Sequence, residues 1–149
     1  MKRIAADDKR SSFVGSDFTY EDVSGRDLED EAHALLRKEN LGGRPTYVIE
    51  SKPKASADYS RRMSWIDSER WLPLKEEYLD ARNEPLRVFT ADKVEQTGKQ
   101  WTVTARSMKN LQSGHRTEVV YQEVGYDVGL KPDIFTERYL RDAPGQWVR

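Results

Sequence analysis

The sequence predicts a mostly β fold, in which a meander of about seven antiparallel strands precedes one short C-terminal helix. Runs that alternate apolar and polar side chains recur along the chain, and turn residues separate them about every 8–12 residues, as is typical of an antiparallel sheet. The charged fraction is 34% and the mean hydropathy is −0.88, a balance that suits a sheet with one face in water. Disorder is disfavoured, because the net charge is only −1 and aromatic residues occur along the whole chain.

One stretch near the start of the chain predicts a compact turn fixed by aromatic rings. It is residues 12–22, Ser-Phe-Val-Gly-Ser-Asp-Phe-Thr-Tyr-Glu-Asp. Gly15 can adopt a positive φ at little steric cost, and Ser16 and Asp17 can hydrogen-bond nearby backbone groups. Phe13 and Phe18 flank the turn on either side. The stretch contains no nucleophile beside a base, no metal-ligand set and no phosphate-binding loop.

Residues 27–40 are compatible with two structures. The spacing of the leucine and alanine residues and the acids near the start favour a helix. The alternative is a short turn, then a strand over 33–40 that a Gly42-Gly43 hairpin joins to a strand over 46–51, because Gly-Gly is typical of a tight hairpin. Propensity alone favours the helix.

The other strands follow from two-residue alternation. They are expected over residues 46–51, 60–67, 74–80, 86–91, 100–108 and 117–124. Pro45 and Pro53 bound the first of these strands, as expected of residues that cannot donate to the hydrogen-bond ladder. Pro132 suits the first turn of a short helix over residues 132–140.

Residues 13–22 resemble the segment F-x-G-S-D-F-S/T-Y-E-D of the outer-membrane lipoprotein-sorting proteins, a LolA-like family of periplasmic lipid-handling proteins. The resemblance continues, in the expected order, through residues 41–54, Tyr59, Trp65–Asp67, 73–78 and 101–117. It extends over roughly residues 12–140 of this chain. The resemblance implies a curved sheet like part of the LolA/LolB half-barrel, and it favours the hairpin at residues 27–40.

The start of the chain differs from the family pattern. Family members carry a signal peptide and further residues before the shared segment, whereas residues 1–10 are polar and lack the apolar core of a signal peptide. The resemblance therefore implies the C-terminal part of a longer LolA-like protein that acts in the periplasm. We expect a single domain over 1–149, with loose tails at 1–11 and 142–149.

Composition and spacing exclude several kinds of site. The chain has no cysteine, which excludes disulfides and thiolate metal sites. A dedicated nucleic-acid-binding protein usually shows a basic face, and the balanced charge of this chain disfavours that function. The sequence contains no run of about 18 apolar residues, so it predicts no membrane-spanning helix. His33 and His115 are far apart in sequence and fit no zinc pattern.

Acidic residues cluster early in the chain. They are Glu21, Asp22, Asp27, Glu29, Asp30 and Glu31. Paired carboxylates can perform acid–base chemistry or bind calcium, but the spacing matches no calcium loop, and a solvated turn explains the cluster better. Asp17, Tyr20 and Asp22 are expected to hold a turn, the alternative being contact with a partner or ligand. The sequence thus predicts no catalytic residue, metal or cofactor.

One apolar surface remains as a candidate binding site. The side chains expected on the concave face of the sheet are Met63, Trp65, Tyr78, Phe89, Trp101, Val103, Val119 and Tyr121. They would either form a core beneath a helix or shelter acyl chains of a lipid or lipoprotein. The resemblance implies a non-enzymatic carrier that serves an envelope transporter.

Two alternatives to the carrier remain. One is a protein-interaction module that holds no lipid. The other, ranked last, is an enzyme that acts on envelope lipids through the acidic cluster. An exposed sheet edge further predicts a homodimer, because unpaired strand edges recruit other strands.

Overall fold

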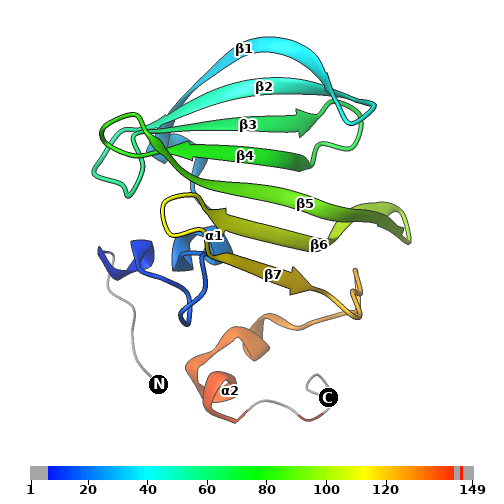
Figure 1. Ribbon diagram of the computed structural model, residues 1–149. Helices are drawn as coiled ribbons and strands as arrows, with labels where there is room; N and C mark the ends of the chain where they lie inside the picture. The colour runs from blue at the N-terminus through cyan, green and yellow to red at the C-terminus, as the bar shows by residue number, and fades with distance from the viewer. Residues whose placement is uncertain (1–6, 143–144, 146–149) are drawn as a thin grey trace.

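The structure, a computed structural model, describes residues 7–142 and 145, and its centre is a seven-stranded antiparallel sheet. Each strand pairs with its neighbours in sequence, so the order across the curved sheet runs from β1 to β7 (Figure 1). The strands are β1 (Glu31–Leu41), β2 (Arg44–Pro53), β3 (Arg61–Asp67), β4 (Pro73–Leu79), β5 (Pro85–Thr97), β6 (Gln100–Asn110) and β7 (Arg116–Val120). The predicted fold class is confirmed.

Residues 27–40 form the hairpin rather than the helix. A 3₁₀ turn, η2 (Leu28–Asp30), leads into β1, which pairs with β2 along its length. Gly42 and Gly43 connect the two strands with φ values of 58° and 85°, the backbone that a two-residue type I′ turn requires. Cross-strand pairing therefore overrides the helical spacing of the leucines.

The predicted single helix over 132–140 is wrong. Pro132 begins a 3₁₀ turn, η3 (Pro132–Phe135), and a separate helix follows, α2 (Glu137–Arg141). Between them Thr136 has an extended backbone, with φ −103° and ψ 160°, and its side chain does not cap α2. A five-residue helix is only marginally stable by itself, so this segment folds as two short turns beyond β7 (Figure 1).

The segment before the sheet, residues 11–30, crosses one face of it. It contains the short helix α1 (Tyr20–Ser24) and follows a 3₁₀ turn, η1 (Asp7–Arg10). We call this stretch the N-terminal segment; in Figure 1 it is blue and lies near one end of the strands. A core of buried side chains forms beneath it, made of Phe18, Tyr59, Tyr78, Phe89 and Met108. The segment therefore distinguishes the two faces of the sheet.

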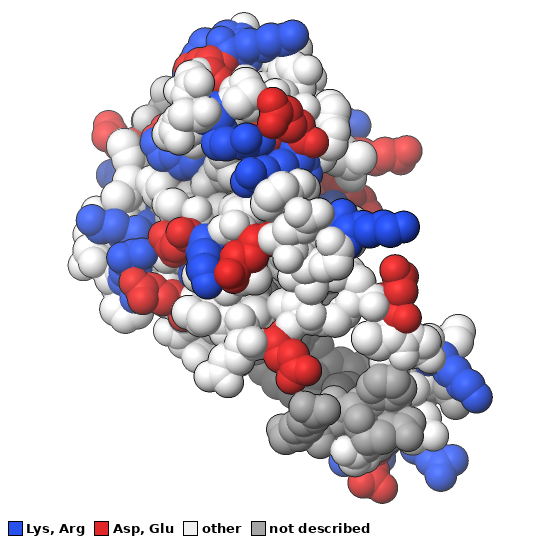
Figure 2. Space-filling view, turned by 90° about the vertical axis from the view of Figure 1, so that its right-hand side faces the viewer, with Lys and Arg blue, Asp and Glu red and all other residues white. Residues whose placement is uncertain are grey.

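Strand register assigns each side chain to a face. On the covered face, which the N-terminal segment crosses, Tyr78 pairs with Arg62 and Arg87, and Phe89 pairs with Met108. The opposite row runs through Val48, Trp65, Lys75, Thr90, Ser107 and Glu118. We call that side the charged face, because ion pairs between residues two apart, such as Lys75–Glu77 at 2.6 Å, line it. Figure 2 shows basic and acidic side chains interspersed on one side of the molecule.

Candidate functional site

The predicted ligand-binding side chains do not share one face, so that expectation is wrong. Met63 and Trp65 lie on the charged face, because Trp65 pairs with Val48 and Lys75. Trp101 lines neither hollow of the covered face and is 37% exposed, and the Arg70 guanidinium lies 3.7 Å from its ring centroid. The prediction failed by one residue in β3, since a shift of one position moves a side chain to the other face.

Tyr78 lies on the covered face, but other side chains pack around its ring and leave no space for a ligand. Its ring is 1% exposed and belongs to the core cluster. The ring of Tyr59 meets it edge-on, with centroids 5.2 Å apart, and the guanidinium of Arg87 lies 4.5 Å from its centroid. Tyr78 therefore supports the fold and cannot contact a ligand in this conformation.

The other four predicted side chains line two adjoining hollows that are mostly apolar. The turn hollow has a volume of about 300 Å³ and is lined by Phe13, Val14, Ser16, Phe18, Val23, Arg106, Thr117, Val119 and Tyr121. The strand hollow has a volume of about 320 Å³ and is lined by Pro73, Phe89, Thr102, Val103, Arg106, Tyr121, Val124 and Tyr126. Because Arg106 and Tyr121 line both, we call the two together the apolar groove. Each volume is at the lower end of the range for small-molecule sites, about 300–1,000 Å³.

The motif at residues 13–22 builds one wall of the turn hollow. Ser16 donates its N–H to the Phe13 carbonyl at 2.9 Å, with Val14 and Gly15 at φ values of 52° and 78°. This is the backbone of a type I′ turn, which asparagine and glycine favour. A β-branched valine there costs about 1–2 kcal/mol, yet Val14 is 80% exposed. The turn thus presents a strained apolar side chain at the rim of the hollow.

Asp17 fastens this turn to β7. Its Oδ2 accepts a hydrogen bond from Thr117 Oγ1 at 2.7 Å and contacts His115 Nδ1 at 2.6 Å. The Asp17 N–H also donates to Thr117 Oγ1, at 3.0 Å. The side chain of Asp17 is buried although His115 is exposed. These contacts explain why an aspartate follows the glycine turn.

Tyr20 and Asp22 complete the motif by ordering the residues that come after the turn. The Tyr20 ring meets the Phe13 ring edge-on, with centroids 5.2 Å apart. Asp22 and Thr19 form a capping box: Asp22 Oδ2 accepts from the Thr19 N–H at 2.8 Å, and Thr19 Oγ1 accepts from the Asp22 N–H at 3.2 Å. These contacts all lie within the N-terminal segment, so they hold the turn and α1 together as one structural unit.

Arg106 lines both hollows, and sequence reasoning did not single it out. Its guanidinium is 5.3 Å from the Phe18 ring centroid and 5.5 Å from that of Tyr121. Its Nε is buried and makes no hydrogen bond. Alternation groups Arg106 with Thr102 and Thr104, a polar side that would ordinarily face water. No sequence signal marks Arg106, because alternation divides the side chains of a strand between two faces but does not show which of the two faces is covered by another segment.

A last hydrogen bond closes the strand hollow. The chain after β7 follows the edge of β6, where the Tyr121 N–H donates to the Thr104 carbonyl at 2.9 Å. It then brings Tyr126 Oη to 2.9 Å from Thr102 Oγ1. The predicted strand over 117–124 ends at Val120 in the structure, and Tyr121, Val124 and Tyr126 beyond it line the strand hollow together with Phe89.

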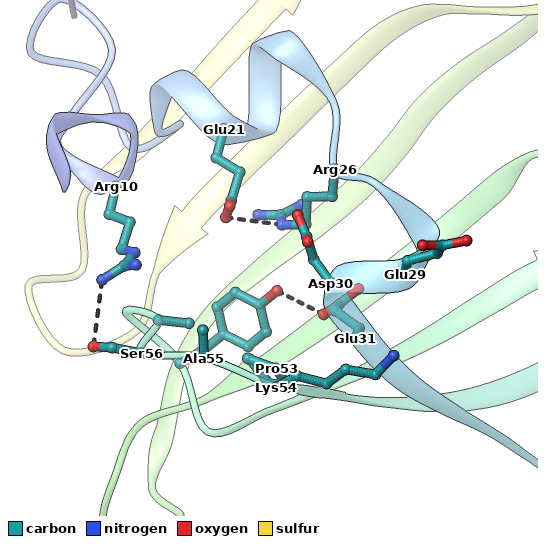
Figure 3. Close-up of a pocket in the computed structure, with 12 residues that line it drawn as sticks. Arg10, Glu21, Arg26, Glu29, Asp30, Glu31, Pro53, Lys54, Ala55 and Ser56 are labelled. Atoms are coloured by element: carbon teal, nitrogen blue, oxygen red, sulfur yellow. Dashed lines mark hydrogen bonds and ion pairs between the residues drawn. The ribbon is translucent and has the colours of Figure 1, made fainter. Parts of the chain in front are cut away.

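The covered face also carries a polar pocket of about 360 Å³ (Figure 3). Glu21, Arg26 and Glu31 line it, and Figure 3 shows the Arg26 guanidinium directed at Glu21, at 3.0 Å. Tyr59 Oη donates to Glu31 Oε1 at 2.6 Å. Burial and then this hydrogen bond raise the pKa of the Tyr59 hydroxyl, so Tyr59 remains a neutral donor.

Buried ion pairs extend from this pocket beneath the N-terminal segment. Arg62 bridges Glu31 at 2.5 Å and Glu76 at 3.1 Å. Arg87 likewise bridges Asp58 at 2.6 Å and Asp22 at 3.5 Å. Burial alone would raise the pKa of Asp22, but Arg87, Arg26 and the Thr19 N–H outweigh it and hold the pKa below its usual value.

The buried members of the acidic cluster are therefore structural. Glu21, Asp22 and Glu31 each pair with an arginine. Among the described residues, no group of three histidine or acidic side chains is placed to hold a metal ion. His33 bonds Ser51 Oγ and the Leu28 carbonyl, at 2.8 and 3.0 Å, and so holds η2 against β1. Within the part of the chain that the structure describes, no helix is long and apolar enough to cross a membrane.

Comparisons with known proteins agree with this geometry. A family model described as "Uncharacterized protein" matches residues 1–142. A protein domain from Vibrio parahaemolyticus, named for outer membrane lipoprotein sorting, is 30% identical with a TM-score of 0.87 and is matched over 94% of this chain and 60% of that chain. A DUF1329 family protein from Desulfovibrio piger is 28% identical with a TM-score of 0.83, over 93% and 59%.

A third solved structure supports the fold alone. It is a LolA superfamily protein from Nitrosomonas europaea, 21% identical with a TM-score of 0.69 over 88% of this chain and 60% of that chain. The chain thus spans about 60% of the length of the solved structures that it resembles. No curated protein matches the sequence. The chain belongs to the family of the matching model, and it is similar in sequence and fold to the outer-membrane lipoprotein-sorting domain and in fold to the LolA superfamily protein.

Proposed function

We propose that this protein is a periplasmic carrier that binds the acyl chains of lipids or lipoproteins in the apolar groove and catalyses no reaction. The observation that carries the proposal is the pair of adjoining apolar hollows on the covered face. Exposed apolar side chains stand at their rim, including Val14, Val23 and Tyr121. The LolA-like fold of the chain supports the same function.

The groove can supply the binding energy without chemistry. Each buried methylene contributes about 0.8 kcal/mol, so ten methylenes give about 8 kcal/mol. That gain is comparable with the cost of association, about 4–15 kcal/mol. Reversible binding of this kind suits a carrier, which must release its cargo, and an envelope transporter would be the partner that loads or receives it.

Extraction of the purified protein tests the carrier. We expect organic solvent to release acyl species that mass spectrometry identifies, and a fluorescent fatty acid to bind the delipidated protein. Val119→Lys should abolish probe binding, because it places a charge in the turn hollow. Val88→Lys is the matched control, since Val88 lies on the charged face opposite the groove. A preparation without acyl species that also ignores the probe would favour the protein-interaction module.

Catalysis by the acidic cluster is the weakest alternative. The carboxylates of Asp22 and Glu31 are held by arginines at short distances, which disfavours their use as free bases. Asn substitutions at Asp22 and Asp30 should leave acyl-chain binding intact in any variant that folds, whereas Asp17→Asn also loosens the turn that forms one wall of the turn hollow. Turnover of an envelope lipid that these substitutions abolish would contradict the non-enzymatic function.

The periplasmic location is part of the proposal. Fractionation of cells that produce the full-length protein should place it with periplasmic markers, and recovery with cytoplasmic markers would contradict it.

We also propose that the protein forms a homodimer through β1. This edge strand is eleven residues long and carries Leu35 and Leu36, which are 61% and 48% exposed. Exposed apolar edge strands pair readily with other strands. Light scattering after size-exclusion chromatography should show a dimer, and Leu36→Lys should shift it to monomer. A monomeric wild-type protein at high concentration would refute the dimer but not the carrier.

A further inference from the structure

Arg106 differs from every other arginine in the sheet. The others pair with carboxylates: Arg37 with Glu39, Arg44 with Asp67, Arg61 with Glu50, Arg62 with Glu31, Arg87 with Asp58 and Arg116 with Glu118. Among the described residues, no carboxylate forms an ion pair with Arg106. Its buried Nε has no hydrogen-bond partner, which is also true of the Nε atoms of Arg61, Arg62 and Arg87. Aromatic rings flank the guanidinium instead. Arg106 is half-buried, so its guanidinium lies at the protein surface beside the hollows without a carboxylate partner and can bind an anionic group.

We propose that Arg106 receives the phosphate of a two-chain anionic phospholipid, with one acyl chain in each hollow. This inference rests on the proposed carrier function and specifies its ligand. Arg106 lines the turn hollow and the strand hollow together, so its guanidinium lies where two chains that enter the hollows would diverge. In a glycerophospholipid the phosphate is attached close to the point at which the chains separate.

The chemistry of the guanidinium suits this head group. Its planar fork binds phosphate through paired hydrogen bonds, which a lysine ammonium cannot reproduce. The rings of Phe18 and Tyr121 hold the guanidinium in place, so little side-chain freedom is lost on binding. A fatty acid fits less well, because its carboxylate lies at the end of one chain and would leave one hollow empty.

Polar groups near Arg106 also suit a lipid glycerol region. Thr102 Oγ1 and Tyr126 Oη, 2.9 Å apart, line the strand hollow beside it. Hydroxyl groups at this position can donate to ester oxygens, since each serves as donor or acceptor. The remaining surface of both hollows is mostly apolar and matches the chains.

Calorimetric titration with three short-chain probes tests the proposal. They are dioctanoyl phosphatidylglycerol, dioctanoylglycerol, which lacks the phosphate, and octanoyl lysophosphatidylglycerol, which lacks one chain. We expect the wild type to bind phosphatidylglycerol about tenfold or more tightly than dioctanoylglycerol, since a charge-assisted hydrogen bond contributes that much. We also expect it to bind phosphatidylglycerol at least about tenfold more tightly than the lysolipid, which buries one chain fewer. Arg106→Gln should bind phosphatidylglycerol and dioctanoylglycerol equally, and Arg106→Lys should recover only part of the preference.

A matched control and the possible failures separate this inference from the carrier function. Arg116→Gln removes a paired arginine on the neighbouring strand and should leave all three affinities unchanged. Equal binding of phosphatidylglycerol by wild type and Arg106→Gln would overturn the head-group assignment while the carrier function stands. Equal binding of the lysolipid would overturn the two-chain arrangement. If folded wild-type protein binds none of the probes, the carrier function itself fails.

Discussion

The two ends of the covered face solve the problem of buried charge in opposite ways. Near β3 and β4, Arg62 lies between Glu31 and Glu76, and each charge has its counter-charge. Near β6 and β7, Arg106 lies between Phe18 and Tyr121 without one. The same N-terminal segment covers both ends. The difference teaches that a charge buried for the fold is neutralised within the fold, whereas the half-buried Arg106 keeps no carboxylate partner, as the proposed phosphate-binding role requires.

The largest expected effect is the difference in stability between two variants that each lack one arginine of the covered face. Arg87→Met leaves Asp22 and Asp58 without their shared partner, and we expect a loss of about 3–5 kcal/mol in the free energy of unfolding. Arg106→Met orphans no carboxylate and should cost less than about 1 kcal/mol. Urea unfolding of both variants provides the measurement. Equal losses would show that Arg106 is as structural as Arg87.

Low pH should lower the free energy of unfolding by protonating Asp22, and the Asp22→Asn variant should lack this part of the pH dependence. The pKa of Asp22 is lower in the folded protein than its usual value, near 3.9 in an unfolded chain. The ionised carboxylate therefore stabilises the fold fully above about pH 4, and this contribution is lost as pH falls through the folded pKa. Asp22→Asn should be less stable at pH 7 and show a shallower loss of unfolding free energy below about pH 4. An unchanged slope would contradict this.

Relief of the strained turn should stabilise the apolar end while impairing its function. Val14→Asn places a residue suited to a type I′ turn before Gly15, and we expect a gain of about 1 kcal/mol in the free energy of unfolding. Affinity for a fluorescent fatty acid should fall, because an apolar side chain leaves the rim.

Leu28→Asn is the matched control for Val14→Asn. Leu28 is equally exposed, at 80%, but lies in η2 at the polar end. Its substitution should leave fatty-acid affinity unchanged. A similar fall in both variants would mean that general surface hydrophobicity, rather than the groove, retains the probe.

The smallest effect concerns the closure of the strand hollow. Tyr126→Phe removes the hydrogen bond to Thr102, which should lower stability by about 0.5–1 kcal/mol. Hydrogen exchange at residues 121–126 should accelerate while exchange in β3 and β4 stays the same. Uniform acceleration across the sheet would show that this bond supports the whole fold.

Local chemistry made most of the fold predictable. Turn residues and two-residue alternation located the strands from β2 to β7. At residues 27–40 propensity favoured a helix, and Gly42-Gly43, together with the family resemblance, favoured the hairpin that includes β1. The C-terminal helix could not be judged in the same way, since Thr136 interrupts it by adopting an extended backbone.

The candidate site was only partly predictable, because it depends on long-range contacts. The apolar groove is lined by four of the eight side chains predicted to form an apolar surface, namely Phe89, Val103, Val119 and Tyr121. Trp65 could not be placed, because cross-strand register decides its face. Arg106 was missed for a related reason: its environment comes from Phe18 and Tyr121, and only the folded chain brings the first of these to it.

The contact between Asp17 and Thr117 joins residues 100 positions apart, whereas every strand pairs with its neighbour along the chain. Hairpins close quickly and distant contacts slowly. The chain should therefore assemble its meander first and dock the Phe13–Ser16 turn last, which pulse-labelled hydrogen exchange during refolding can follow. In a newly synthesised molecule the apolar groove would therefore be complete only after the sheet has folded.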